Sequence, residues 1–489
     1  MNRFLWAELA LIAGALIPYR HRMTEPSPGQ RASTESISDY GIARIFWIAV
    51  ALAGASAAYA VSGARDLVYD GSFYLLDIAS HGAFQLFEPG RISVQLLQQG
   101  FAVIGARLGI YDLWTLGRLF SLGASGWPIV LTALCWFVLP RAEKSWIVGP
   151  LLNLVLAIPV TSFIGIGEGV IASCLLWLAF LLTWFRMDRS WGALAAIVAA
   201  IACAFSHESA MLCLVLIAAL AASQVRNAKG FARAAAIVAA VVTAAGALYL
   251  LRWILIPRSA IERSDFLVSL LGGFLGTPRA PNLSALASLA AAAAILLSQN
   301  RRLRAAAAGL CLAVLALLLL LLIAMPGDTI APIRFFAARG LPVALTTLIA
   351  LAFLLMKRRG LCPAQFANLP LLAVLLGLCV FQPLAQAIMT ENWNAYVRDL
   401  RAVVSTRHGI VTHADAMHEL DAQGTPFRRE LLESWSVEPL SIVLAPHGRV
   451  TAVVEPAPMA RWTPYRLNDP AALPQAPGLD WSGFASVQR

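Results

Sequence analysis

The stretch AAAAGLCLAVLALLLLLLIAM, residues 305–325, contains no ionisable side chain apart from one cysteine. About twenty apolar residues are enough for a helix to cross the hydrocarbon core of a bilayer, and a helix also satisfies its own backbone hydrogen bonds there. Similar runs recur along the 489 residues, of which 59% are hydrophobic and only 13% charged. The sequence therefore predicts a polytopic α-helical membrane protein.

The apolar runs predict about eleven membrane-spanning helices. Their expected ranges are 45–63, 116–139, 146–162, 169–185, 191–205, 209–223, 234–256, 282–298, 305–325, 337–356 and 365–388.

The basic residues give these spans an expected orientation. The three lysines of the chain, Lys144, Lys229 and Lys357, fall in loops on one side when the spans alternate, together with most arginine clusters. Positively charged loops stay in the cytoplasm, so this side is expected to be cytoplasmic. The opposite side would be the periplasm of a bacterial inner membrane. Because the basic residues are scattered in short loops, the net charge of +10 indicates membrane topology and not nucleic-acid binding.

Three regions follow from this pattern. Residues 1–44 form an N-terminal segment, in which 1–22 either span the membrane, lie on its surface or are cleaved, and 23–43 form a flexible cytoplasmic connector. Residues 45–388 form the transmembrane domain, with a first outer loop at 64–115. Residues 389–489 are expected to form a small periplasmic α+β domain. In it, WNAYVRDLRAVVS (393–405) predicts a helix, and LSIVLAPHGRVTAVV (440–454) predicts two strands joined by a turn.

The first outer loop opens with RDLVYDGSFYLLDIASHG, residues 65–82, which is unusually rich in acids. If residues 66–81 form one unbroken helix, Asp66, Asp70, Asp77 and His81 lie within an arc of about 60°. Asp70, Asp77 and His81 are then candidate ligands for a divalent cation such as Mg²⁺ or Mn²⁺. The alternative is a set of ordinary solvated loop residues.

Other ionisable residues lie at the expected outer ends of helices. They are Glu168, His207, Glu208, Arg252, Arg334 and Arg339. The acids and the histidine could be site residues. Alternatively, His207 and Glu208 could start a helix that Ser206 caps, and Glu168 could complement a helix dipole. The arginines are candidates for binding an anion on the outer side.

The outer loop resembles the first outer loop of GT-C superfamily glycosyltransferases, membrane enzymes that use sugars linked to polyprenyl phosphate. The resemblance rests on YDGSFYLLDIASHG (69–82), the second amphipathic helix in EPGRISVQLLQQGFAVIGARLGIYDL (88–113) and the Arg118-Leu119 pair. It implies that Asp70 is the catalytic base. Many members have a second acid where this chain has Gly71, so Asp66 or Asp77 would take the second acidic role.

The resemblance implies an enzyme that moves a sugar from a polyprenyl-phosphate donor to a glycan or lipid acceptor on the periplasmic side. Arg334, Arg339 and Arg252 would bind the donor phosphate, and residues 93–111 would lie along the membrane surface. Three alternatives remain open on the sequence: a transporter or flippase of a lipid-linked precursor, an enzyme similar to O-antigen ligases or polymerases, and a membrane protein that only binds a partner.

Overall fold

The structure is a computed structural model. It describes residues 31–68, 70–86, 89–157, 168–226, 228–256, 280–324, 335–407, 409–424, 434–445, 450–454 and 479.

Long helices form most of the described chain. They are α2 (Arg31–Ser62), α5 (Leu113–Val138), α7 (Glu168–Phe185), α8 (Ser190–Ala204), α9 (Met211–Val225), α10 (Gly230–Leu255), α12 (Ala280–Leu297), α13 (Arg301–Ala324), α14 (Phe335–Arg358) and α15 (Leu369–Ser405). Within the described residues, seven helices are long and apolar enough to cross a membrane, and α8 and part of α12 are shorter apolar helices. A helical membrane protein is confirmed, while the count of about eleven spans stays a prediction.

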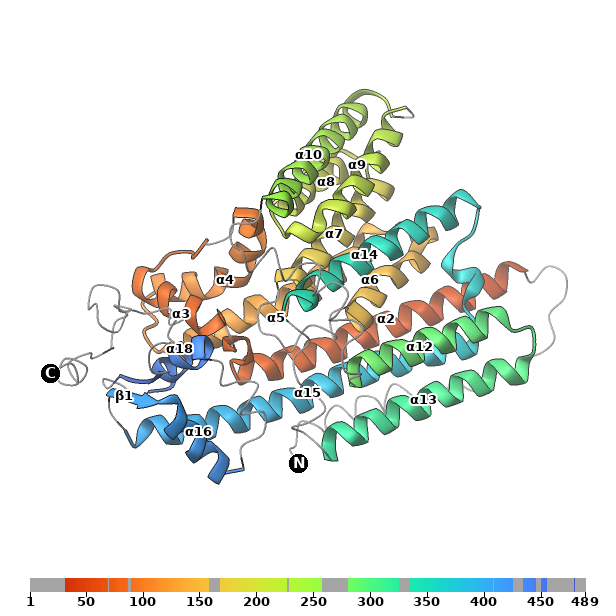
Figure 1. Ribbon diagram of the computed structural model, residues 1–489. Helices are drawn as coiled ribbons and strands as arrows, with labels where there is room; N and C mark the ends of the chain where they lie inside the picture. The colour runs from red at the N-terminus through yellow and green to blue at the C-terminus, as the bar shows by residue number, and fades with distance from the viewer. Residues whose placement is uncertain are drawn as a thin grey trace.

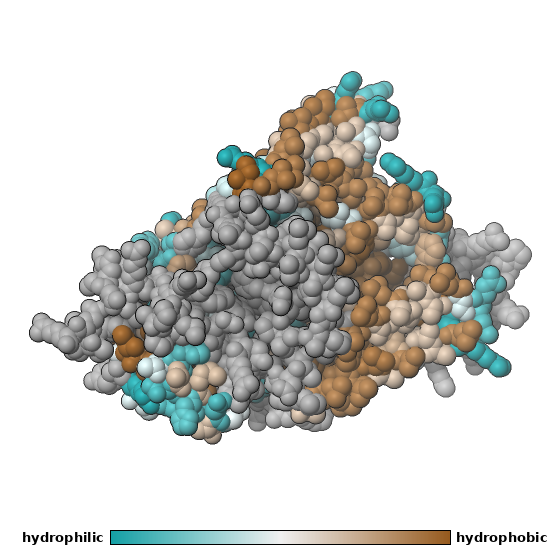
Figure 2. Space-filling model, viewed as in Figure 1, coloured by the Kyte–Doolittle hydropathy of each residue, from teal (hydrophilic) through white to brown (hydrophobic). Residues whose placement is uncertain are grey.

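The shorter elements gather mainly at one end of the bundle. Figure 1 shows α3 (Asp70–His81), α4 (Ile92–Arg107), α16 (His413–Ala422) and α18 (Ser434–Leu444) together there, and we call this the loop end. The turn between α9 and α10 and the end of α14 lie at the other end, which we call the lysine end because Lys229 is in that turn and Lys357 is in the last turn of α14. Lys144 is near Lys357, since Glu143 pairs with Lys357. Hydrophobic side chains cover the sides of the helices, and hydrophilic ones lie near their ends (Figure 2). This distribution is typical of a protein that is surrounded by lipid.

The core near the lysine end is aromatic. The ring centroids of Trp146 and Phe353 are 4.9 Å apart, and those of Trp177 and Phe353 are 5.8 Å apart, both edge-on. Deeper in the bundle, the Asn153 amide donates to the Ser173 hydroxyl at 3.1 Å and accepts from Thr346 at 3.1 Å. These contacts join three segments of the bundle through fully buried side chains, and polar groups in lipid need such partners.

Two segments of the structure differ from the prediction. The third predicted span, 146–162, is not one regular helix in its described part, which ends at residue 157. The chain there passes from the end of η4 (Arg141–Ile147) through α6 (Val148–Leu152) to the π-helical turn η5 (Asn153–Ala157). Pro150 lacks a backbone N–H and so weakens the helix there. The expected flexible connector is also shorter than predicted, because α2 begins at Arg31. Residues 31–43 contain no proline, so nothing in them interrupts the helix.

The C-terminal part contains strands β1 (Gly409–Thr412) and β2 (Thr451–Val454), which pair in parallel. The prediction of two strands in 440–454 is wrong in its first half, because residues 434–444 form α18. Every residue from Val437 to Leu444 is buried. A short run that is buried on all sides is compatible with a strand and with a helix, so its apolar pattern does not distinguish them. The predicted helix 393–405 is confirmed. It continues α15, so the expected domain boundary at 389 lies inside one helix.

Candidate functional site

The outer loop begins with a buried anchor. The Arg65 guanidinium donates to the Gln386 side chain at 2.8 Å and to the Thr390 hydroxyl at 3.1 Å, both on α15. The Asp66 carboxylate accepts from Ser125 on α5 at 2.8 Å. Burial raises the pKa of Asp66, while Arg65 and the serines oppose that rise. The short turn η2 (Arg65–Leu67) is therefore held between two long helices.

The acidic stretch is not one continuous helix. Val68 has an extended backbone (φ −58°, ψ 145°) between η2 and α3, so the expectation of a single face from Asp66 to His81 is wrong. On α3 itself, Asp70, Asp77 and His81 stand at i, i+7 and i+11 and share an arc of about 40°. Asp70 and Asp77 are half-buried, whereas His81 is exposed. Burial raises the pKa of Asp77, and the charge of His81 opposes that rise.

Gly71 stands where a second acid was expected, and the packing explains its identity. A Cβ atom on residue 71 would overlap the backbone oxygen of Asp66 and touch the Phe120 ring at 3.4 Å. Any side chain there would push α3 away from η2. The second acid is absent because the chain turns back on itself too tightly to hold one.

We expect Gly71→Ala to lower the free energy of unfolding by about 1 to 3 kcal/mol, because overpacking forces the backbone to shift. The matched control is Gly100→Ala on α4, where a new Cβ atom meets nothing within 4 Å. Alanine should stabilise that helix by up to about 1 kcal/mol. Thermal unfolding of both variants in detergent measures the difference, and equal midpoints would contradict the packing argument.

A buried charge cluster lies where the outer loop meets the bundle. Arg91, the last residue of η3 (Pro89–Arg91), donates from Nη1 to Glu168 at 2.9 Å. Its Nε donates to both carboxylate oxygens of Glu208, at 3.1 and 3.0 Å. Glu168 is only 1% exposed, and the Gln95 amide donates to it at 3.2 Å. We call Arg91, Gln95, Glu168, His207 and Glu208 the arginine cluster.

His207 precedes the turn η6 (Glu208–Ala210) and caps it. The Ser209 backbone N–H donates to His207 Nδ1 at 3.2 Å, so Nδ1 carries no proton in this arrangement. The same nitrogen lies 3.6 Å from the Glu208 carboxylate. The expected cap was Ser206, but its hydroxyl donates to the Cys203 carbonyl at 2.8 Å, and His207 caps the turn instead. The structure also brings His207 and Glu208 together with Glu168.

Of the three arginines predicted to bind phosphate, the structure describes the side chain of Arg252 only. Arg252 lies in the last turn of α10, exposed, with its guanidinium 5.8 Å from the ring centroid of Trp253. A Cβ atom on Gly90 would lie 3.6 Å from Trp253, so Arg252 and the arginine cluster belong to neighbouring parts of the loop end. Arg334 lies outside the described residues. Arg339 is part of α14, but its side chain lies outside them too.

The amphipathic helix α4 has its polar side turned inward. Gln95, Gln98 and Gln99 are fully buried, whereas Phe101 and Ile104 are exposed. A helix on a soluble protein shows the opposite arrangement. The predicted separation into two faces holds only in part, because Val94 and Val103 are buried together with the glutamines and Arg107 is exposed.

The predicted metal ligands do not form a site by themselves. Among the described residues, no three His, Cys, Asp or Glu side chains gather as they would to hold a metal ion. Asp70 and Asp77 are two turns apart on α3, about 10 Å along the axis. They are therefore too far apart along the helix to contact one ion together.

Sequence reasoning missed Arg91, which the structure places at the centre of the cluster. Its partners lie 77 and 117 residues away in the chain, so local spacing could not reveal them. The available signal was a single arginine between a Pro-Gly turn and an otherwise uncharged helix start.

No family model, curated protein or solved structure matches this chain. The described helices and their apolar surfaces define the class as a helical membrane protein, with several helices able to cross a bilayer. What the protein does must be inferred from its own residues.

Proposed function

We propose that the protein is a glycosyltransferase that moves a sugar from a polyprenyl-phosphate donor to a hydroxyl acceptor at the loop end. The observation that supports this best is the environment of Asp70. It begins α3 and stays half-buried, whereas Asp66 is buried and held by Ser125. Asp70 and Asp77 are thus the acids of α3 that an acceptor could reach, and the resemblance to GT-C glycosyltransferases favours Asp70 as the base. In this proposal Asp66 anchors the loop and is not catalytic.

In the proposed reaction, the acceptor hydroxyl oxygen attacks the anomeric carbon of the sugar and gives its proton to the Asp70 carboxylate. The bond between the anomeric carbon and the phosphate oxygen breaks, and its electron pair leaves with the phosphate. A cation near that phosphate stabilises the negative charge that develops. In this proposal Arg252 is that cation. Arg334 and Arg339, which the sequence analysis named as candidates for binding the donor phosphate, assist it.

The remaining loop-end residues have supporting roles in this proposal. The arginine cluster fixes η3, and with it the start of α4, against α7 and η6. The apolar outer face of α4 contacts lipid, so a donor's isoprenoid tail stays in the membrane while its phosphate reaches the loop end. Asp77 and His81 continue the Asp70 face of α3 toward water and are candidates for acceptor contacts.

The test is sugar transfer in membranes supplied with polyprenyl phosphate linked to a carbon-14-labelled hexose or pentose. Asp70→Asn removes the base, so we expect transfer to fall about a hundredfold to ten-thousandfold. Asp188→Asn is the matched control, because Asp188 is exposed in the turn between α7 and α8 at the lysine end. Normal transfer by a correctly inserted Asp70→Asn protein would contradict the proposal.

A further inference from the structure

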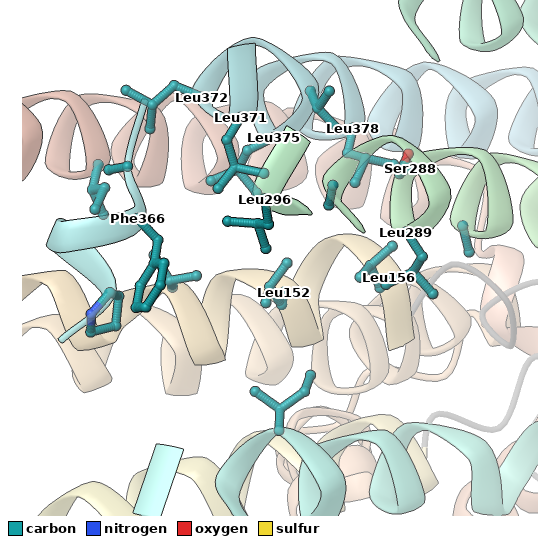
Figure 3. Close-up of a pocket in the computed structure, with 18 of the residues that line it drawn as sticks. Leu152, Leu156, Ser288, Leu289, Leu296, Phe366, Leu371, Leu372, Leu375 and Leu378 are labelled. Atoms are coloured by element: carbon teal, nitrogen blue, oxygen red, sulfur yellow. The ribbon is translucent and has the colours of Figure 1, made fainter. Parts of the chain in front are cut away.

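A second feature lies at the lysine end, away from the loop-end residues. It is a cavity of about 390 Å³ between α2, α6, η5, α12, α14, α15 and η7 (Pro363–Phe366). Figure 3 shows Leu152, Leu156, Leu289, Leu296 and Phe366 around it, on several different elements. An engineered cavity of about 150 Å³ with such a lining already binds benzene. This cavity has room for a considerably larger apolar molecule.

The lining is almost entirely apolar and offers too few polar partners to hold water. Its one side chain with a hydroxyl, Ser288, donates to the Ser284 carbonyl at 2.7 Å. Water needs two to four polar partners to occupy a cavity, and an empty apolar cavity loses dispersion contacts. A hydrocarbon chain supplies those contacts without requiring any hydrogen bond.

The length of the cavity matches one leaflet of a bilayer. Its lining on α14 extends from Leu345 to Met356, and on α12 from Ala285 to Leu296. Each interval is about 16 Å at the helical rise of 1.5 Å per residue. Half of the hydrocarbon core of a bilayer is about 15 Å. The cavity therefore fits an acyl chain that enters from the leaflet at the lysine end.

The end of the cavity near Met356 is next to positive charge. Lys357, Arg358 and Arg359 follow Met356 directly, and all three are exposed. Lys357 is paired with Glu143 at 2.8 Å, so Arg358 and Arg359 are the better partners for an anion. Basic residues beside gaps between membrane helices commonly bind anionic lipid head groups.

We propose that this cavity binds one acyl chain of an anionic phospholipid, whose head group contacts Arg358 and Arg359. The site is separate from the loop end and does not rest on the transfer reaction. A lipid held here fills the space between α12 and α14 and joins them to α15. It is a bound lipid of the leaflet at the lysine end, and not the sugar donor.

The experiment reconstitutes the full chain in nanodiscs that contain phosphatidylglycerol with a photoreactive group on one acyl chain. Crosslinked peptides are then identified by mass spectrometry. We expect labelling to concentrate on the parts of α12, α14 and α15 that line the cavity. Leu289→Trp places a bulky ring in the cavity, and Leu289 is already 53% exposed, so the core is not overpacked. Labelling of the cavity should fall about fivefold or more.

Leu320→Trp is the matched control, because Leu320 is 63% exposed on α13 and does not line the cavity. It should leave cavity labelling unchanged. Arg358→Gln with Arg359→Gln should lower the preference for phosphatidylglycerol over phosphatidylcholine about thirtyfold, at about 1 kcal/mol per basic residue. Arg233→Gln, an exposed arginine in the first turn of α10, should not.

Two results would overturn the proposal. Equal labelling of the cavity and of the exposed face of α13, with no effect of Leu289→Trp, would mean that lipid only surrounds the protein. Loss of the label on adding unlabelled polyprenyl phosphate, but not unlabelled phosphatidylglycerol, would identify an isoprenoid chain as the occupant. If Leu289→Trp fails to insert, Leu296→Trp repeats the test, and the competition with unlabelled lipids needs no variant.

Discussion

Replacing Arg91 with alanine is expected to cost about 3 to 5 kcal/mol in the free energy of unfolding, because it leaves buried carboxylates without their counter-charge. Glu168 is 1% exposed, and Glu208 shares the same guanidinium. The measurement is thermal unfolding in detergent with a thiol-reactive dye. Six of the seven cysteines are buried and free, so they react only when the bundle opens.

Arg107→Ala is the control for this experiment. Arg107 is exposed in the same loop, and its Nε donates to the Gly82 carbonyl at 2.8 Å. Its loss should cost less than about 1 kcal/mol, as for most surface substitutions. Adding Glu208→Gln to Arg91→Ala removes one uncompensated charge and should recover part of the loss. If Arg91→Ala unfolds with the same midpoint as Arg107→Ala, the cluster does not hold the outer loop.

The stability of the C-terminal strands should fall as the pH rises, because of one buried acid. Glu438 on α18 is 0% exposed, and neither carboxylate oxygen has a hydrogen-bond partner among the described residues. Burial raises the pKa of Glu438 from 4.5 to about 8. The folded protein therefore keeps a proton that the unfolded chain releases, and folding loses stability between these two values. The full loss is up to about 5 kcal/mol.

Glu438→Gln keeps the shape of the side chain and removes the proton equilibrium, so stability should no longer depend on pH in this window. Hydrogen exchange of the β1 and β2 amides, corrected for the intrinsic rate, gives the opening free energy between about pH 5 and pH 9. Asp415→Asn, an exposed acid on α16, is the control and should keep the wild-type slope. A flat profile in the unmodified protein would show that Glu438 is solvated or paired.

Much of the helical pattern could be predicted, because long apolar runs leave few alternatives in lipid. The regular predicted spans coincide with long helices, and α5 begins one residue after Asp112, which caps it by accepting from the Thr115 N–H at 2.8 Å. The irregular segments were harder. Gly149 packs against Trp177, and η5 is widened around Asn153, through contacts that lie far apart in the chain.

The candidate site could be predicted only in part, for a similar reason. The ionisable residues at helix ends could be identified because charges are rare in this sequence. Glu168, His207 and Glu208 lie in one cluster in the structure. Their common partner Arg91 belongs to another segment, so only the folded chain reveals it. Gly71 and Ser72 weakened the prediction of an unbroken helix, but no residue type placed the break at Val68.

The helix α15 is longer than a membrane-spanning helix needs to be. Its 37 residues extend for about 55 Å, whereas the hydrocarbon core of a bilayer is about 30 Å thick. About 25 Å of rigid helix is left over, and Trp393 ties part of it to the end of α2 by donating to the Gly63 carbonyl at 2.8 Å. This helix acts as a strut. It contacts β2, α16 and α18, and α18 in turn packs against α3, so α15 links the C-terminal strands to the helix that carries Asp70.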